Sequence, residues 1–295
     1  MLFIANYVMK GQLPAYIATA ILALLTVWFG PVGMLLGAVI ALVTLRVGSG
    51  EGLKVLTAAV AINLVATQAF LGASLPAIVA IAEYMVPVWL MAWVLRNTNS
   101  LASALSLGML MTGAVVIAFH MMVGDTTAWW SNMMNTALLP YVKEAGVAAP
   151  ADLIATMSEV ATMLLAMFMV VLWFSILLLG RWWQGRLYHP GQFQQDFYQV
   201  RLPKNLAYLA VVLAIAGLVF KSGMVQDLSG VMMAGLMFPG LAIAHHAVAV
   251  KKMGNGWLVG LYVLLFLFPQ TILILATIGL IDTWLDIRSR WSQDS

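Results

Sequence analysis

Apolar runs about as long as a bilayer is thick recur along the whole chain, and this repetition constrains the fold more than any other feature. A spanning α-helix needs about 20 predominantly apolar residues. Hydrophobic residues make up 63% of the chain and charged residues 8%, where a soluble domain has about 45–50% and about 25%. These values exclude a soluble globular enzyme, a disordered chain and a nucleic-acid-binding domain. The candidate spans are 13–29, 31–46, 53–72, 75–95, 102–123, 158–180, 204–222, 228–250 and 255–285.

This pattern predicts an all-α fold: a polytopic transmembrane helix bundle with eight or nine membrane helices, some of them broken by proline. We expect residues 1–295 to form a single integral membrane domain. With the N-terminus in the cytoplasm, most of the 14 Lys and Arg residues fall on the cytoplasmic side, as the positive-inside rule requires. The sequence therefore predicts a multi-pass protein of the bacterial cytoplasmic (inner) membrane with a cytoplasmic N-terminus.

Two interruptions leave the number of spans open. The first two runs meet at Gly30-Pro31, which favours a helical hairpin, with one long broken helix as the alternative. Pro269 interrupts the last run, which is either one kinked span or two half-helices. A single span puts Arg288 and Arg290 on the outer side, whereas re-entry after Pro269 returns them to the cytoplasmic side. The side of the C-terminus therefore stays open in this interpretation.

Two long connections separate the runs. Residues 124–157 form an outer loop of aromatic and polar residues, which lies on the membrane surface or folds over the bundle as a lid. Residues 181–203 form a cytoplasmic connector, in which apolar residues at helical spacing lie among basic ones. We expect an amphipathic helix resting on anionic lipid there, or a docking surface for a cytoplasmic protein. The residues of this membrane-surface or partner site are Arg181, Arg186, Phe193, Phe197, Val200, Arg201 and Lys204.

Glu83 is the ionisable residue nearest the middle of a predicted span. A charged acid there costs about 2.5–3.5 kcal/mol on insertion scales, so it is protonated, paired or exposed to water. Pro87 follows four residues later and removes the helical donor for the carbonyl of Glu83. One position thus offers a carboxyl group and a free carbonyl, which suits a proton, a cation or an amine. The alternative is a neutral Glu83 that hydrogen-bonds a neighbouring helix and serves packing only.

Polar residues of the preceding span lie at a similar depth. Asn63 and Glu83 fall on adjacent antiparallel segments at nearly equal distances from the outer end. Thr67 lies one helical turn from Asn63, and Gln68 is close by. These residues predict a polar cluster that binds a small solute, or else interhelical hydrogen bonds worth about 0.6 kcal/mol each.

Two further spans carry a proline near their middle. Pro239 and Pro269 each free one backbone carbonyl, and Gln270 adds a polar side chain beside the second. Broken helices near the midplane recur at transporter binding sites, although prolines are also ordinary in membrane helices. We therefore expect helix breaks at Pro87, Pro239 and Pro269, with Gln270 as a further ligand-binding candidate.

A stripe of small residues at Gly33, Gly37 and Ala41 permits the close approach of another helix. Such a stripe serves packing between helices of the same chain, or docking of another membrane subunit. A shorter stripe of the same kind is formed by Gly256 and Gly260.

No pattern typical of catalysis, nucleotide binding or metal binding is present. The neighbours His245 and His246 point to different faces of a helix, so we assign them, like His120 near the end of its span, an interfacial role. The chain has no cysteine, which excludes disulfides and thiolate metal sites. It also lacks the P-loop and the common hydrolase motifs. We therefore predict no enzyme activity, no catalytic residue, no metal, no cofactor and no nucleic-acid partner.

Three stretches resemble a known bacterial family. They are Phe29-Gly30-Pro31 through Thr44-Leu45-Arg46-Val47-Gly48 to Gly52-Leu53-Lys54, the connector with Arg181-Trp182-Trp183, His189-Pro190-Gly191-Gln192-Phe193 and Val200-Arg201-Leu202-Pro203, and the ending Gly279-Leu280-Ile281-Asp282-Thr283-Trp284-Leu285-Asp286-Ile287-Arg288. Over nearly the whole chain this pattern resembles the YybS-like integral membrane family, domain of unknown function 2232. That family has no established activity. It is distantly similar to the substrate-binding S components of energy-coupling-factor vitamin transporters and to the rod-shape protein MreD.

The likeness to S components implies a partner membrane subunit and cytoplasmic ATPases, with residues 33–41 as a docking face. In the final motif, Asp282 and Asp286 share a helix face with Arg290, which predicts a salt-bridged ladder at the membrane edge.

Two functions follow as hypotheses. The first is a small-solute-binding or transport component with its site around Glu83. The alternative is a non-transporting scaffold or assembly factor, similar to MreD, that recruits partners through residues 181–203. The expected partners are the lipid bilayer and either another membrane subunit or a cytoplasmic protein.

Overall fold

The computed structural model describes residues 1–144, 151–220 and 223–288. Within these ranges the chain is helical and contains no strand, which confirms the predicted all-α fold. The chain divides into two compact units: unit 1 comprises Met1–Gly108 and Val171–Val200, and unit 2 comprises Met109–Val170 and Arg201–Ser295. The helices α7 and α10 each begin in one unit and end in the other.

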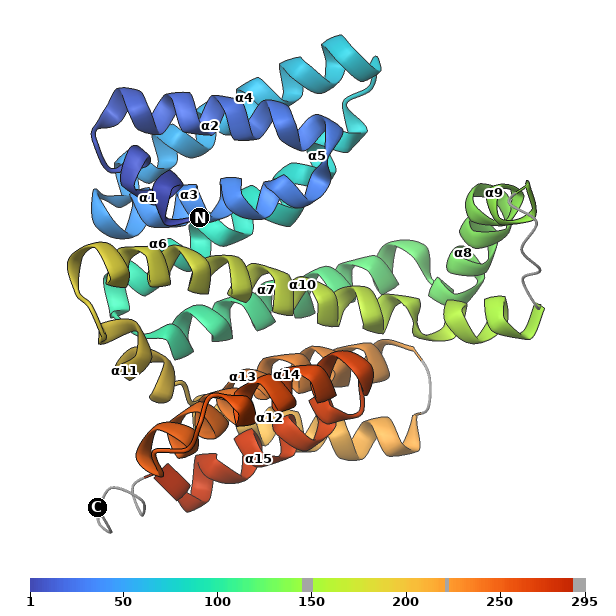
Figure 1. Cartoon of the computed structure of the whole chain (residues 1–295). Helices are drawn as coiled ribbons and strands as arrows, with labels where there is room; N and C mark the ends of the chain where they lie inside the picture. The colour runs from blue at the N-terminus through green and yellow to red at the C-terminus, as the bar shows by residue number, and fades with distance from the viewer. Residues whose placement is uncertain (145–150, 221–222, 289–295) are drawn as a thin grey trace. The chain divides into compact units, whose positions relative to one another are not determined.

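Unit 1 is built around α3, in which every residue from Leu36 to Leu45 is buried. A helix that is apolar all round belongs in the interior of a bundle, and α3 contacts α2, α4 and α6 (Figure 1). The elements of this unit are α1 (Leu2–Val8), α2 (Gln12–Trp28), η1 (Gly30–Val32), α3 (Gly33–Arg46), α4 (Ser49–Leu71), α5 (Leu75–Ala80), η2 (Ile81–Met85), α6 (Val86–Thr98), the start of α7 (Leu101–Val123), the end of α10 (Ala151–Tyr188) and α11 (Gln192–Tyr198).

The first two apolar runs form a helical hairpin, as one of the two interpretations of the sequence expected. The short turn η1 contains Pro31 in its first turn, where proline needs no N–H partner. Gly11, just before α2, and Arg46, at the end of α3, line the same pocket, so the two helices run in opposite directions. One long broken helix is thereby excluded.

Unit 2 is built around α13, whose residues from Val231 to Ile243 are almost all buried. The helix that packs most closely on it is α15. The elements of this unit are the remainder of α7 and of α10, α8 (Thr126–Met133), η3 (Met134–Leu138), α9 (Leu139–Glu144), α12 (Lys204–Val219), α13 (Met224–Val250), α14 (Gly256–Leu267) and α15 (Thr271–Leu285).

The last predicted span is two short helices, α14 and α15, separated at Pro269. The end of α12 lies beside the start of α13, where Gly217 adjoins Ser229, and its start lies beside the end of α15, where the rings of Tyr208 and Trp284 are 5.7 Å apart. Both α13 and α15 therefore run opposite to α12 and in the same direction as each other (Figure 1).

The segment α14–α15 is a helical hairpin. α14 has 12 residues, about 18 Å of helix, which is too short to cross a hydrocarbon core of about 30 Å. It runs back along α13, where Tyr262 Oη lies 2.9 Å from His245 Nε2. α15 then returns past the middle of α13, because the backbone of Leu275 lies against Gly240. Arg288 consequently lies at the same end of unit 2 as Arg201, and both bond Asp282.

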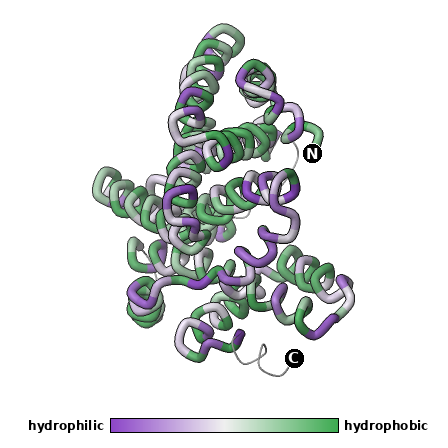
Figure 2. Tube along the Cα trace, turned by 90° about the vertical axis from the view of Figure 1, so that its left-hand side faces the viewer, coloured by the Kyte–Doolittle hydropathy of each residue, from purple (hydrophilic) through white to green (hydrophobic). Residues whose placement is uncertain are grey.

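Among the residues that the structure describes, five helices are long and apolar enough to cross a membrane, by length and composition: Ser49–Leu71, Leu75–Thr98, Leu101–Val123, Asp152–Tyr188 and Met224–Val250. Shorter apolar helices occupy the other predicted runs. Figure 2 shows hydrophobic residues along the helices and hydrophilic residues mainly at their ends and connections. The helical membrane bundle predicted from the sequence is therefore confirmed.

Two connections differ from the sequence prediction. Much of the connection at 124–157 is helical, since α8, η3, α9 and the first turns of α10 lie within it. α8 begins at Thr126 because the Asp125 side chain accepts a hydrogen bond from the N–H of Ala128, 2.9 Å away. α10 continues to Tyr188 and takes in the first third of the predicted connector.

The expected helix break at Pro239 is wrong, because α13 continues through it without interruption. A membrane helix tolerates proline where neighbouring helices support the distorted turn. Here α15 provides that support, since Gly279 lies against the Pro239 ring and the carbonyl of Leu236.

The close contact between α13 and α15 leads to a test at Gly240. A Cβ atom at this position would overlap the backbone carbonyl of Leu275, whereas a Cβ at Gly256 has nothing within 4 Å. We expect Gly240→Ala to lower the free energy of unfolding by about 1–3 kcal/mol, the usual cost of overpacking. Gly256→Ala is the matched control and should leave stability unchanged. Unfolding of the detergent-purified variants by heat or SDS measures both, and equal stability of the two would contradict the described packing.

Candidate functional site

Glu83 lies in a π-helical turn, η2, in the middle of an otherwise α-helical segment. The N–H of Val86 bonds the carbonyl of Ile81, five residues back, and Pro87 follows directly in α6. Proline has no N–H and its ring collides with the carbonyl four residues earlier, so a wider turn accommodates it. The helix is thus distorted at Pro87 but continues to Thr98. The Glu83 side chain is half-buried.

The π-turn is held in place by the small-residue stripe of α3. A Cβ atom at Gly33 would overlap the ring of Tyr84, and a Cβ at Gly37 would overlap the backbone carbonyl of Tyr84. The third member of the stripe, Ala41, lies against Gly180 of α10. The stripe therefore packs against η2 and α10 inside unit 1, and this packing fixes the backbone on which Glu83 stands.

The polar residues of α4 are not joined to Glu83 as a cluster. Asn63 is 1% exposed, and its Nδ2 donates to the carbonyl of Ala23 at 3.0 Å, which ties α4 to α2. The hydroxyl of Thr67 donates to the carbonyl of Asn63 at 2.6 Å. Gln68 is exposed. α4 contacts η2, but in the described part of the chain no hydrogen bond joins Asn63 to Glu83.

One polar atom of this region is unsatisfied. Asn63 Oδ1 is buried and has no hydrogen-bond partner among the described residues. A buried acceptor left without a donor costs about 1–3 kcal/mol. Gln270, the remaining ligand-binding candidate, belongs to unit 2, where it is exposed in the turn between α14 and α15.

Buried apolar side chains and an ion pair hold the connector in place within unit 1. Phe197 and Val200 are buried, and the Phe193 and Phe197 rings stack with centroids 6.1 Å apart. Arg181 Nε donates to Asp196 Oδ2 at 3.0 Å, whereas Arg186 is exposed. The apolar face of α11 thus packs inward, and Arg186 remains free for a lipid or a partner.

The first of the three stretches that resemble the family, residues 29–54, contacts α10 at one end of unit 1. Arg96 Nη1 donates to the carbonyls of Thr44 and Leu45 at 3.2 and 2.7 Å. Gln184 Nε2 donates to the carbonyl of Leu45 at 3.3 Å. These donors satisfy carbonyls that the end of α3 leaves without intrahelical partners.

The second and third stretches that resemble the family contact each other in unit 2, where Arg201 of the second bonds Asp282 of the third. Asp282 is 0% exposed. Its Oδ2 accepts hydrogen bonds from Arg288 Nη2 at 2.6 Å and from Arg201 Nε at 3.2 Å. Arg201 Nη2 also donates to Asp286. The predicted ladder is therefore built with Arg201 and Arg288, and Arg290 lies outside the described residues. Burial lowers the pKa of Arg201, but the hydrogen bonds and charges of Asp286 and Asp282 outweigh it and raise that pKa.

A second buried pair was not predicted from the sequence. His120 Nε2 lies 2.7 Å from Asp227 Oδ2, and both side chains are almost fully buried in unit 2. The predicted span began at residue 228, so Asp227 counted as part of a connection. α13 begins at Met224 instead and places this acid in its first turn. The aromatic residues next to the pair in sequence pack together, with the Phe119 and Trp129 rings 5.3 Å apart.

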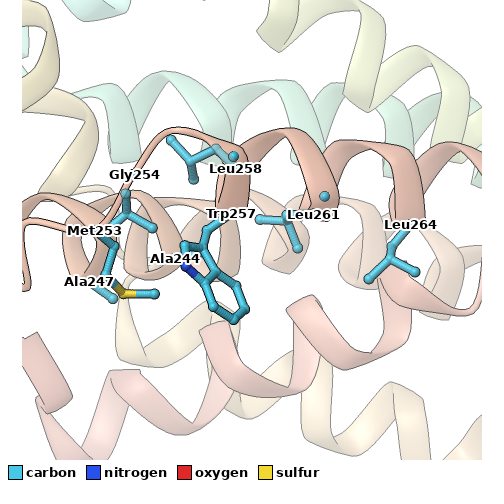
Figure 3. Close-up of a pocket in the computed structure, with 11 residues that line it drawn as sticks. Ala244, Ala247, Met253, Gly254, Trp257, Leu258, Leu261 and Leu264 are labelled. Atoms are coloured by element: carbon cyan, nitrogen blue, oxygen red, sulfur yellow. The ribbon is translucent and has the colours of Figure 1, made fainter.

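A cavity of about 720 Å³ lies between the end of α13 and α14, and its lining is apolar. Figure 3 shows Ala244 and Ala247 of α13 on one side and Trp257, Leu261 and Leu264 of α14 on the other. Since α14 has no buried residue, this hollow is an open apolar groove. Among the described residues, no three His, Asp or Glu side chains gather closely enough to hold a metal ion.

The apolar helices and the polar groups at their ends define a multi-pass helical membrane protein. Residues 17–283 match the model of the family described as predicted membrane protein, domain of unknown function 2232, and the chain belongs to that family. No curated protein and no solved structure matches the chain.

Proposed function

We propose that this protein is a small-solute-binding or transport component of the bacterial cytoplasmic membrane, with Glu83 as the residue that contacts the solute. The observation that carries this proposal is the position of Glu83 in a π-helical turn within an apolar helix of 24 residues. π-turns of this kind are frequent at functional sites, and an acid at this depth is costly unless a cation, a proton or a donor compensates it.

The rigidity of the turn supports the same proposal. Tyr84, next to Glu83, is enclosed by the glycines of α3, so the carboxyl group stands on a fixed backbone. Half-burial leaves the carboxyl group within reach of a ligand. A carboxylate accepts hydrogen bonds and therefore favours a solute that carries N–H donors, such as an amine.

A membrane orientation follows from the charges of unit 1. Arg46, Arg96 and Arg186 stand at the ends of α3, α6 and α10 that meet one another. Under the positive-inside rule this end is cytoplasmic, and the N-terminus, close to the same end, is cytoplasmic too. The proposal also includes a partner membrane subunit with cytoplasmic ATPases, which is what the resemblance to S components implies.

The second candidate function is a scaffold or assembly factor that acts through residues 181–203. The observation in its favour is the fixed connector, in which Trp183 is 0% exposed and Arg181 is paired with Asp196. A connector that is held in one conformation and exposes Arg186 presents a constant surface for binding a cytoplasmic protein.

The test is the thermal stability of the purified protein with a panel of small amines and monovalent cations. A ligand at about 100 times its Kd stabilises the folded protein by about 2.7 kcal/mol. We expect at least one amine to stabilise the wild type, and Glu83→Gln to abolish this effect. Glu159→Gln, at an exposed glutamate of α10, is the matched control and should respond like the wild type. An unchanged response of Glu83→Gln would contradict the proposal, and no stabilisation by any amine would favour the scaffold.

A further inference from the structure

A second cavity, of about 370 Å³, lies in unit 1 at the end of the helices, away from the π-turn of Glu83. It is enclosed where α1 passes into α2, where α3 passes into α4, and by Tyr188 at the end of α10. Ligand pockets for small molecules measure about 300–1,000 Å³ and combine apolar walls with a few polar groups. The volume of this cavity falls within that range.

The cavity has a fixed cation on its wall. The guanidinium carbon of Arg46 lies 3.9 Å from the centroid of the Tyr188 ring, a stacked arrangement that holds the planar group in one orientation. Within the described ranges, Arg46 has no carboxylate partner. Its N–H donors are therefore available to an anionic group, and a stacked guanidinium suits the paired oxygens of a phosphate.

The same cavity carries an acid, Glu51. One of its oxygens, Oε1, bonds Lys54 Nζ at 2.7 Å on the exposed side. A simple anion that approached Arg46 would be repelled by this carboxylate. A ligand that carries a positive amine beside its anionic group satisfies both side chains.

Apart from Gln12, which is polar, the remaining walls are mainly apolar. Val8, Val43 and Val55 line the cavity together with the ring of Tyr16, and Val8, Val43 and Val55 are at most 3% exposed. The charged residues Arg46, Glu51 and Lys54 mark this end of the helices as the boundary between hydrocarbon and water. A ligand that enters there has its polar group at Arg46 and Glu51 and an apolar part against the valines.

We propose that this pocket binds a phosphoethanolamine group, with the phosphate at Arg46 and the primary ammonium at Glu51. The group belongs either to a phospholipid headgroup or to a free soluble molecule, and the two sources share this chemistry. The inference is independent of the solute proposed at Glu83, because none of the residues that line this pocket belongs to η2.

The test measures thermal unfolding of the detergent-purified protein against short-chain phosphatidylethanolamine, phosphatidylcholine and phosphatidylglycerol, and against free O-phosphoethanolamine. We expect saturable stabilisation, with the lowest apparent Kd for phosphatidylethanolamine among the lipids. Free O-phosphoethanolamine that binds as tightly identifies a soluble ligand, whereas much weaker binding identifies the lipid. Either result supports the pocket chemistry.

Three variants distinguish this pocket from general lipid binding. Arg46→Gln should raise the apparent Kd about tenfold or more, as expected when a hydrogen bond to a charged group is lost. Glu51→Gln should abolish the preference for the ethanolamine over the choline headgroup, because choline has no N–H. Arg186→Gln, at an exposed arginine outside the pocket, should bind like the wild type. Wild-type affinity of Arg46→Gln, or no headgroup preference in the wild type, would overturn the proposal.

Discussion

Replacing Asp282 with alanine is expected to lower the free energy of unfolding by about 3–5 kcal/mol, the usual cost of removing one partner of a buried ion pair. Asp282 is 0% exposed, and both of its carboxylate oxygens accept hydrogen bonds. Oδ1 accepts from the N–H of Ile287 at 2.8 Å, and Oδ2 accepts from Arg288 and Arg201. Without this acid, the buried Arg288 keeps its charge and loses its ion pair with Asp282.

Asp286→Asn is the control for this prediction, because asparagine tolerates the left-handed backbone of Asp286 (φ 45°) and removes only the charge. Asp286 also bonds Arg201, but its side chain is 51% exposed, and exposed ion pairs contribute about 0–1 kcal/mol. Unfolding of both variants in SDS or by heat, in the same detergent, gives the two changes in stability. If Asp282→Ala were no less stable than Asp286→Asn, the buried network would not hold the end of α15 to the start of α12.

Replacing Asp227 with alanine is the second change with a large expected effect, a loss of about 3 kcal/mol. The Asp227 carboxylate is 2.7 Å from His120 Nε2, and the side chains are 4% and 12% exposed. The change leaves the His120 ring nitrogen without its partner in a region that water scarcely reaches. Since the two residues are 107 positions apart in sequence, their bond joins α7 to α13, and its loss should loosen unit 2.

A double-mutant cycle separates this bond from simple loss of volume. We expect His120→Ala and Asp227→Ala to be strongly non-additive, because either change alone already breaks the contact. Asp227→Asn keeps an acceptor for the imidazole and should retain much of the stability. Additive losses in the double variant would show that the two side chains do not interact.

Much of the fold could be predicted because its main cause is local composition. Runs of about 20 apolar residues have few alternatives to helices in a bilayer, and the described part of each predicted run is mainly helical. Local composition does not predict whether the helix breaks at Pro239. A helix continues through a proline or ends there depending on which residues pack against the distorted turn. The glycine of α15 that contacts Pro239 lies 40 residues later.

The candidate sites depend on partners that are distant in sequence. Asn63 was expected beside Glu83, yet its amide bonds Ala23, which lies 40 residues before it. Arg201 was assigned to a lipid or protein surface, and its partners are 81 and 85 residues away. Charge alone indicates that a side chain needs a partner and does not indicate which one. Glu83 and Pro87 were recognisable because their chemistry is coupled over a single helical turn.

The hairpin of α14 and α15 also determines at which end of unit 2 the C-terminal motif lies. Because α14 begins and α15 ends at the same end of α13, the two helices together produce no net displacement along it. The segment from Arg201 to Arg288 therefore begins and ends at one end of unit 2. A hydropathy profile that scores residues 255–285 as one helix would place these two arginines at opposite ends.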